Sequence, residues 1–66
     1  MEITLNGNLK QIPDGSTATR LIEILQLTGK RLAIEINEEI VPRSTYGGHK
    51  LNPGDQVEIV HAIGGG

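Results

Sequence analysis

The chain has 66 residues, so it forms one domain that buries only about 60% of the surface its unfolded form exposes, and it has little room for a deep substrate cavity. It contains no cysteine, which excludes disulfides, thiolate metal sites and a persulfide on its own side chains. With a net charge of -2 and Tyr46 as its single aromatic residue, it lacks the basic surface and the stacking groups of a nucleic-acid binder.

The first segment has the pattern of a β-hairpin. Ile3 and Leu5 alternate with polar residues, as in a half-buried strand that starts close to the N-terminus. Asn6-Gly7 predicts a tight turn, and residues 9–12 then form the returning strand. Residues 13–15, Pro-Asp-Gly, end this strand.

One helix is predicted after the hairpin. Thr17 is its expected N-cap residue, with Ser16 as the alternative. Its apolar face consists of Ala18, Leu21, Ile22 and Leu25. This helix is too short to be stable alone, so we expect it to bury its apolar face against a sheet. Gly29 marks the end of the helix or of the loop that follows it.

A second hairpin follows the helix. Residues 32–36 alternate between apolar and polar positions and form the third predicted strand. Residues 37–39 are a polar reversal, and residues 40–41 are a short returning strand that Pro42 ends. Residues 44–50 are polar and contain glycine, so they are predicted to be a loop or irregular turn.

The last predicted strand, residues 57–63, follows a turn at residues 52–55. In that turn we expect Gly54 to have a positive φ and Asp55 to accept backbone N–H bonds. The strand carries apolar residues on both faces, which indicates a central strand or one whose second face meets a partner. A long connection allows it to pair in parallel with the first strand. The order of elements predicts an α+β domain, a sheet packed on one helix.

The chain then runs through Gly64, Gly65 and Gly66. From Ile63 this glycine tail spans at most about 13 Å, and it is narrow because its residues have no Cβ atom. A terminal carboxylate becomes reactive when an ATP-dependent partner converts it into an acyl-adenylate, from which a sulfur nucleophile displaces AMP. The alternative interpretation is an inert terminus or a cloning remnant.

Three segments resemble the ThiS family, the sulfur-carrier proteins of thiamine biosynthesis. The first is residues 14–25, which carry Asp14-Gly15-Ser16-Thr17 and the helical face. The second is residues 36–43, with the sequence Ile-Asn-Glu-Glu-Ile-Val-Pro-Arg. The third is residues 51–60 together with Gly65-Gly66. The resemblance covers the whole chain. Residues 36–43 combined with the two glycines are its most specific part.

The resemblance implies a ubiquitin-like β-grasp fold, with a mixed sheet of four to five strands on one main helix. Residues 1–63 would form this domain and residues 64–66 a flexible tail. It implies that Gly66 is adenylylated and converted into a thiocarboxylate, so that the chain is a carrier rather than an enzyme. No cofactor is expected to bind tightly.

The partners that the resemblance implies are a ThiF-type adenylyltransferase that consumes ATP, thiazole synthase, and a sulfur donor such as a cysteine desulfurase. The absence of a signal peptide or an apolar span long enough for a membrane favours the cytoplasm. Neither nucleic acid nor a membrane is an expected partner.

A docking patch is predicted on the sheet face away from the helix, formed by Ala33, Val60 and Ala62. Ordinary exposure of single apolar residues is the alternative. Arg43 is a candidate contact for an acidic group of the partner, or one half of a weak surface salt bridge. The two histidines, His49 and His61, lack the context of a nucleophile, and Glu38-Glu39 is interpreted as a solvated turn.

Three other functions stay open at this point. The small subunit of molybdopterin synthase is a close alternative, although the Ile-Val-Pro-Arg stretch and the short length favour the thiamine branch. A ubiquitin-like modifier would form isopeptide bonds to lysines, and a plain interaction module would have an inert tail. An enzyme with its own active site is the weakest option.

Overall fold

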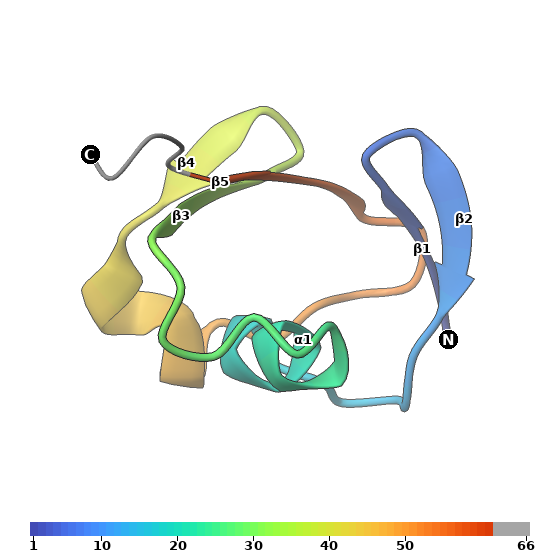
Figure 1. Ribbon diagram of the computed structural model, residues 1–66. Helices are drawn as coiled ribbons and strands as arrows, with labels where there is room; N and C mark the ends of the chain where they lie inside the picture. Colours follow the sequence, from blue (N-terminus) through green and yellow to red (C-terminus); the bar gives the residue numbers. More distant parts are fainter. Residues whose placement is uncertain (62–66) are drawn as a thin grey trace.

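The computed structural model describes residues 1–61. These residues form a five-stranded sheet with helical segments on one side (Figure 1). The elements in chain order are β1 (Glu2–Leu5), β2 (Asn8–Gln11), α1 (Ala18–Ile24), β3 (Leu32–Ile36), β4 (Glu39–Val41), the 3₁₀ helix η1 (Arg43–Gly48) and β5 (Gln56–His61). The strand order is β2-β1-β5-β3-β4. The predicted α+β architecture, with a mixed sheet on one main helix, is confirmed.

The last strand lies at the centre of the sheet, as its apolar pattern predicted. β5 pairs in parallel with β1, where Leu5 lies opposite Val57. On its other side β5 pairs antiparallel with β3 over five residue pairs, from Leu32–His61 to Ile36–Val57. The two hairpins, β1–β2 and β3–β4, therefore flank the strand that closes the fold.

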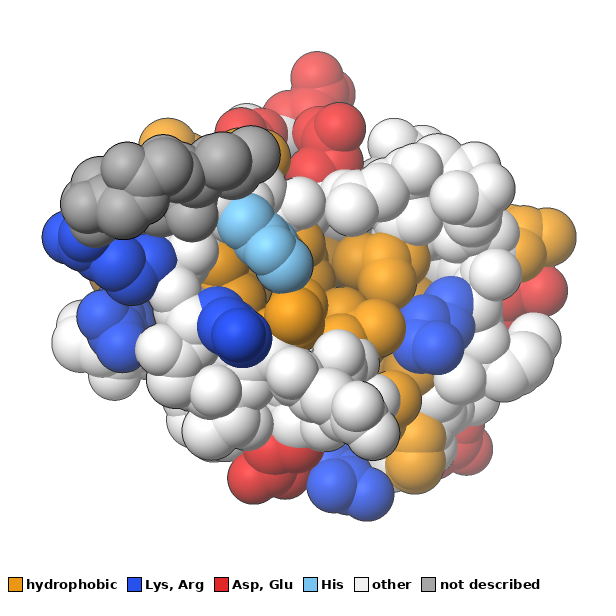
Figure 2. Space-filling view, in the orientation of Figure 1, with side chains coloured by type: hydrophobic (Ala, Val, Ile, Leu, Met, Phe, Trp, Pro, Cys, Tyr) orange, Lys and Arg blue, Asp and Glu red, His pale blue; other side chains and the backbone are white. Residues whose placement is uncertain are grey.

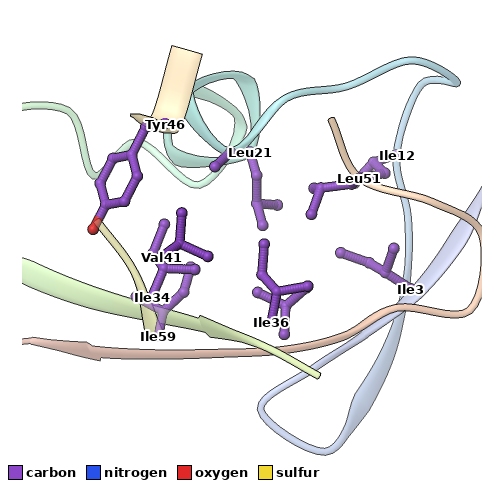
Figure 3. Packing of buried hydrophobic residues seen from close by; sticks show 11 residues of the cluster. Ile3, Ile12, Leu21, Ile34, Ile36, Val41, Tyr46, Leu51 and Ile59 are labelled. Carbon is purple, nitrogen blue, oxygen red and sulfur yellow. The ribbon is translucent and has the colours of Figure 1, made fainter. Parts of the chain in front are cut away.

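The hydrophobic core fills the space between the sheet and α1 (Figure 3). The sheet contributes alternate strand residues to this core, which are Ile3, Ile34, Ile36, Val41, Val57 and Ile59. Leu21 of α1 and Tyr46 of η1 approach them from the opposite side (Figure 3). The alternating pattern of the strands thus separates one buried face from one face that points away from the helix.

Helix α1 begins where the sequence predicts it. Thr17 has an extended backbone (φ -95°), and its Oγ1 accepts a hydrogen bond of 3.1 Å from the backbone N–H of Arg20. Ser16 has a different role, because its hydroxyl donates to the carbonyl of Pro13 at 2.6 Å. Ala18 and Leu21 are fully buried, whereas Ile22 and Leu25 are half-buried at the edge of the core.

The segment predicted as a loop over residues 44–50 instead contains a 3₁₀ helix, η1. Pro42 lies just before it, and the Pro42 carbonyl accepts bonds from both the backbone N–H and the hydroxyl of Thr45, at 2.9 and 2.8 Å. The turn brings Tyr46 under α1 and buries its ring. Packing of this one aromatic side chain explains why a polar, glycine-containing segment becomes regular.

The helical segments are short. α1 has seven residues and η1 has six. Within residues 1–61, neither is long and apolar enough to cross a membrane.

We expect Leu21→Ala to lower the free energy of unfolding by about 2–5 kcal/mol, because it leaves a cavity where Leu21 is fully buried. The matched control is Leu9→Ala, since Leu9 is 71% exposed. This control should change the free energy by less than about 0.5 kcal/mol. Urea denaturation followed by circular dichroism measures both values, and equal losses would contradict the assignment of Leu21 to the core.

Candidate functional site

Of the predicted site residues, the structure describes Ala33, Arg43 and Val60. Ala62 and the tail residues Gly64, Gly65 and Gly66 lie outside residues 1–61. The geometry of the candidate site is therefore that of β5, the strand that precedes the glycine tail in sequence, and of the residues around it.

The turn after β1 holds β5 through an asparagine side chain. The backbone N–H of Asn6 donates to the carbonyl of Val57 at 2.9 Å. One residue pair further, the Asn6 Oδ1 accepts from the backbone N–H of Ile59 at 2.9 Å and its Nδ2 donates to the Ile59 carbonyl at 3.4 Å. The amide group thus takes the place of a peptide group and extends the ladder beyond the end of β1.

A second asparagine holds β5 from the β3 side. Asn37 exchanges two hydrogen bonds with Gln56, because its N–H donates to the Gln56 carbonyl at 2.8 Å and its Oδ1 accepts from the Gln56 N–H at 3.0 Å. Its Nδ2 also donates to Asp55 Oδ1 at 3.1 Å. Both asparagines have a positive φ, 49° at Asn6 and 52° at Asn37, a conformation that asparagine tolerates better than most residues.

Asp55 closes the turn that leads into β5. Its Oδ2 accepts from the backbone N–H of Asn52 at 2.8 Å, and Gly54 has φ 85°. Both roles agree with the predictions for this turn. β5 is therefore fixed at its start by Asp55 and Asn37 and near its end by Asn6.

The structure brings together the three described residues of the predicted docking group. Val60 is 63% exposed and lies opposite Ala33 in the β3–β5 register, on the sheet face away from α1. Arg43, at the start of η1, lines an open hollow of about 380 Å³ together with Ala33 and Val60. Arg31, Leu32 and His61 complete its lining. The predicted placement on the outer face is confirmed for Ala33 and Val60.

The sequence reasoning missed a row of side chains on the same face. Glu35 of β3 lies opposite both Glu58 of β5 and Ile40 of β4, and Ile40 is 73% exposed. In Figure 2, acidic side chains gather on the side of the sheet away from the helix, at the top of the view. Alternation within each strand identifies the outward residues, but the pairing of the two glutamates depends on register.

The remaining candidate residues form no catalytic arrangement within residues 1–61. His49 lines a hollow together with Asn52 and Asp55, whereas His61 lines a different hollow beside Val60. Glu38 and Glu39 are both exposed at the β3–β4 turn, as predicted for a solvated reversal.

The mixed sheet with one main helix on a single face is the architecture of a β-grasp domain. Residues 3–66 match the model of the ThiS family, and the chain belongs to this family. It is 35% identical over 66 residues to the protein named sulfur carrier protein ThiS of Escherichia coli, and the match covers 100% of both chains. A sulfur carrier protein ThiS of Bacillus subtilis is 37% identical over 65 residues, and the match covers 97% of this chain and 98% of that protein.

Structural comparison gives the same result. The crystal structure of a thiamine biosynthesis protein, ThiS, from Geobacter metallireducens superposes with a TM-score of 0.85 at 26% identity and full coverage of both chains. A thiazole synthase of Magnetococcus marinus is 41% identical over 66 residues, but the chain spans only 20% of the length of that protein.

We expect Asn6→Ala to weaken the end of β5, because it leaves the Ile59 N–H without its 2.9 Å partner. A lost partner of this kind costs about 1–3 kcal/mol. Hydrogen exchange of the Ile59 amide should become faster, whereas exchange of the Ile34 amide should change less. In the control Asn6→Asp, which keeps an acceptor for the Ile59 N–H, most of the protection should remain. Equal exchange at Ile59 in wild type and Asn6→Ala would disprove the bracing role.

Proposed function

We propose that the chain is a sulfur carrier of thiamine biosynthesis and that the α-carboxylate of Gly66 carries the sulfur. The observation that carries this proposal is the match with a sulfur carrier protein ThiS that is 35% identical over 66 residues, with both chains covered from end to end. Family membership over residues 3–66, which include the glycines, supports it as well.

The proposed chemistry takes place on the main chain. A carboxylate oxygen of Gly66 attacks the α-phosphate of ATP, which gives an acyl-adenylate and releases pyrophosphate. Hydrosulfide then attacks the acyl carbon, AMP leaves with the bonding electrons, and loss of the S–H proton gives the thiocarboxylate. A persulfide donor instead gives an acyl disulfide, from which a thiol reductant releases the thiocarboxylate and forms a disulfide. Gly64 and Gly65 have no side chains, so a narrow active site can admit the tail without a clash at Cβ. The chain is the substrate in each step rather than the catalyst.

Three partners follow from this chemistry. A ThiF-type adenylyltransferase consumes ATP and forms the adenylate, and a sulfur donor such as a cysteine desulfurase supplies the sulfur. Thiazole synthase accepts the sulfur for thiazole formation. Two proteins named thiazole synthase contain a segment that matches the whole chain, at 41% and 38% identity, which supports a place for carrier and synthase in one pathway.

The exposed side chains near the end of β5 fit the docking role that the proposal requires. Residues 1–63 would serve as the domain that a partner recognises, and residues 64–66 as the arm that enters its active site. Val60 and Ala33 lie on the outer face, with Arg43 at the edge of the adjoining hollow. Ala62, which the prediction also includes, lies outside residues 1–61. Exposed apolar side chains of this kind are suited to burial against a partner.

The proposal is tested by mass spectrometry after incubation with the cognate adenylyltransferase, ATP and a sulfur donor. We expect the mass increase of one oxygen replaced by one sulfur, located at Gly66 by fragmentation. A chain with an amidated C-terminus has no free carboxylate and should show no change. Gly65→Val should retain the circular dichroism spectrum but lose most of the modification, because a β-branched side chain obstructs the tail.

Other products would redirect the assignment. Stable conjugates with lysines of other proteins would indicate a ubiquitin-like modifier. Transfer of the sulfur to a pterin precursor would indicate the small subunit of molybdopterin synthase, and an unmodified chain in every case would contradict the carrier function.

Docking through the outer face is tested with Val60→Lys. This change should raise the KM for adenylylation by roughly tenfold or more, since burial of a valine side chain contributes about 1.5–3 kcal/mol. It should leave the urea midpoint nearly unchanged, because Val60 is 63% exposed. The control Leu9→Lys alters another exposed outer-face residue, on edge strand β2, and should leave KM unchanged. Unfolding of Val60→Lys would instead place Val60 in the core.

A further inference from the structure

The turn between β1 and β2 contains a reactive residue pair that the proposed function does not use. The backbone nitrogen that follows an asparagine can attack the carbonyl carbon of the asparagine side chain. Glycine in the following position favours this attack, because it has no side chain to obstruct it. The chain has four asparagines, and Asn6 alone precedes a glycine, Gly7. The others precede leucine, glutamate and proline, and they are Asn8, Asn37 and Asn52.

The surroundings of the turn leave this pair open to water. Asn6 and Gly7 are both exposed. Within residues 1–61, and apart from the adjoining residues, no atom lies within 4 Å of the position that a Cβ atom would take at Gly7. The φ angles of 49° and 85° are those of a tight two-residue hairpin turn. Neighbouring side chains therefore do not protect the pair from reaction.

The side-chain amide of Asn6 is restrained by β5 instead. Its Oδ1 accepts from the Ile59 N–H at 2.9 Å, and its Nδ2 donates to the Ile59 carbonyl at 3.4 Å. Attack by the Gly7 nitrogen closes a five-membered ring and expels Nδ2, so the amide has to turn away from Ile59 and towards its own backbone. Both hydrogen bonds are lost in this movement. The reaction consequently requires the contact between the turn and β5 to open first.

We propose that Asn6 is a site of deamidation whose rate is controlled by the opening of its contact with β5. The Gly7 nitrogen attacks Cγ of Asn6 and loses its proton, the bond from Cγ to Nδ2 breaks, and ammonia leaves a cyclic succinimide. Water then opens the ring at either carbonyl carbon and yields aspartate or isoaspartate at position 6. One water is consumed and one ammonia is released, and no other reactant takes part.

Both products hold β5 less well than asparagine does. Aspartate keeps an acceptor for the Ile59 N–H, but it turns a carboxylate oxygen instead of a donor towards the Ile59 carbonyl. Isoaspartate also lengthens the main chain within a turn whose length sets the register of Leu5 opposite Asn8. Its carboxylate is bonded directly to Cα and reaches less far towards Ile59. The reaction therefore converts a transient opening into a permanent loss of this brace.

The rate is measured on the full chain at one mildly alkaline pH, in buffer and in urea concentrated enough to unfold it. Mass spectrometry with fragmentation follows the replacement of NH₂ by OH at each asparagine. We expect Asn6 to react roughly tenfold or more faster in urea, because the opening that releases its amide is rare in the folded chain. Asn8, which precedes Leu9, is the internal control and should stay largely intact in both solutions. Equal rates at Asn6 would disprove the control by the fold.

The variant Gly7→Ala tests the reaction itself. It is compared with wild type in urea only, where the positive φ of Gly7 has no influence. The added methyl group should slow deamidation of Asn6 several-fold, because it obstructs the attacking nitrogen. An unchanged rate in this variant, or an intact Asn6 in unfolded wild type, would show that Asn6 is not a site of this reaction.

The role of β5 is separated from that of the turn by low urea concentrations, below the unfolding transition. Deamidation of Asn6 should rise there in parallel with hydrogen exchange of the Ile59 amide, which reports opening of the contact. A rate at Asn6 that stays constant while exchange at Ile59 rises would place the restraint in the turn alone and overturn the role of β5.

The consequence for the fold is measured on the deamidated chain, which ion exchange separates because it carries one more negative charge. Hydrogen exchange of the Ile59 amide should be faster in the isoaspartate form than in unreacted protein, whereas exchange of the Ile34 amide should change less. Unchanged exchange at Ile59 would show that the brace survives the reaction. None of these measurements involves the glycine tail or an adenylyltransferase, so their outcome is independent of the carrier function.

Discussion

The placement of β5 between β1 and β3 is the constraint on which the rest of the structure depends. β5 is the last element of the described chain, yet it lies at the centre of the sheet and hydrogen-bonds on both sides. The two hairpins share no strand pair with each other, so β5 joins them into one sheet. The parallel pairing with β1 also requires a long connection, and α1 within that connection covers the face that β5 completes. The integrity of the fold is consequently set by the strand that precedes the glycine tail in sequence.

The β1–β5 pair is short, and side chains compensate for its length. Only Thr4–Gln56 and Leu5–Val57 are paired in parallel. Asn6 continues the ladder with its amide group, and Asn37 does the same at the other side of β5. Such bonds stabilise by only about 0.5–1.5 kcal/mol each, but in a domain of this size each is a noticeable part of the total. Two turn residues therefore determine how firmly the strand before the glycine tail is held.

Local sequence patterns predicted most of the fold. Alternation defined the strands, the cap at Thr17 defined the start of α1, and Gly54 and Asp55 defined the last turn, because each depends on near neighbours in the chain. Tyr46 was missed as a core residue, since its burial depends on contact with α1, which no local pattern shows. The bracing role of Asn6 was also missed: Asn-Gly indicates a turn, but the partner Ile59 lies 53 positions away.

Part of the candidate site could likewise be predicted from local patterns, and part could not. Exposure of Val60 and Ala33 could be predicted from alternation within their strands, because it needs only the assignment of the buried face. The pairing of Glu35 with Glu58 could not, since it depends on how β3 is aligned with β5. A shift of this register by two residues would keep the same faces and separate the glutamates, so the hydrophobic pattern alone does not distinguish the two alignments.

The pairing of Glu35 with Glu58 is informative because like charges directly opposite each other destabilise a strand pair, and a small domain has little stability to lose. Uncharged residues at either position would satisfy the strand pattern equally well, and the buried partners Ile34–Ile59 and Ile36–Val57 would be unaffected. Local departures from the best choice for folding are expected mainly at functional sites. Here the departure lies on the exposed face of the central strand, beside Val60.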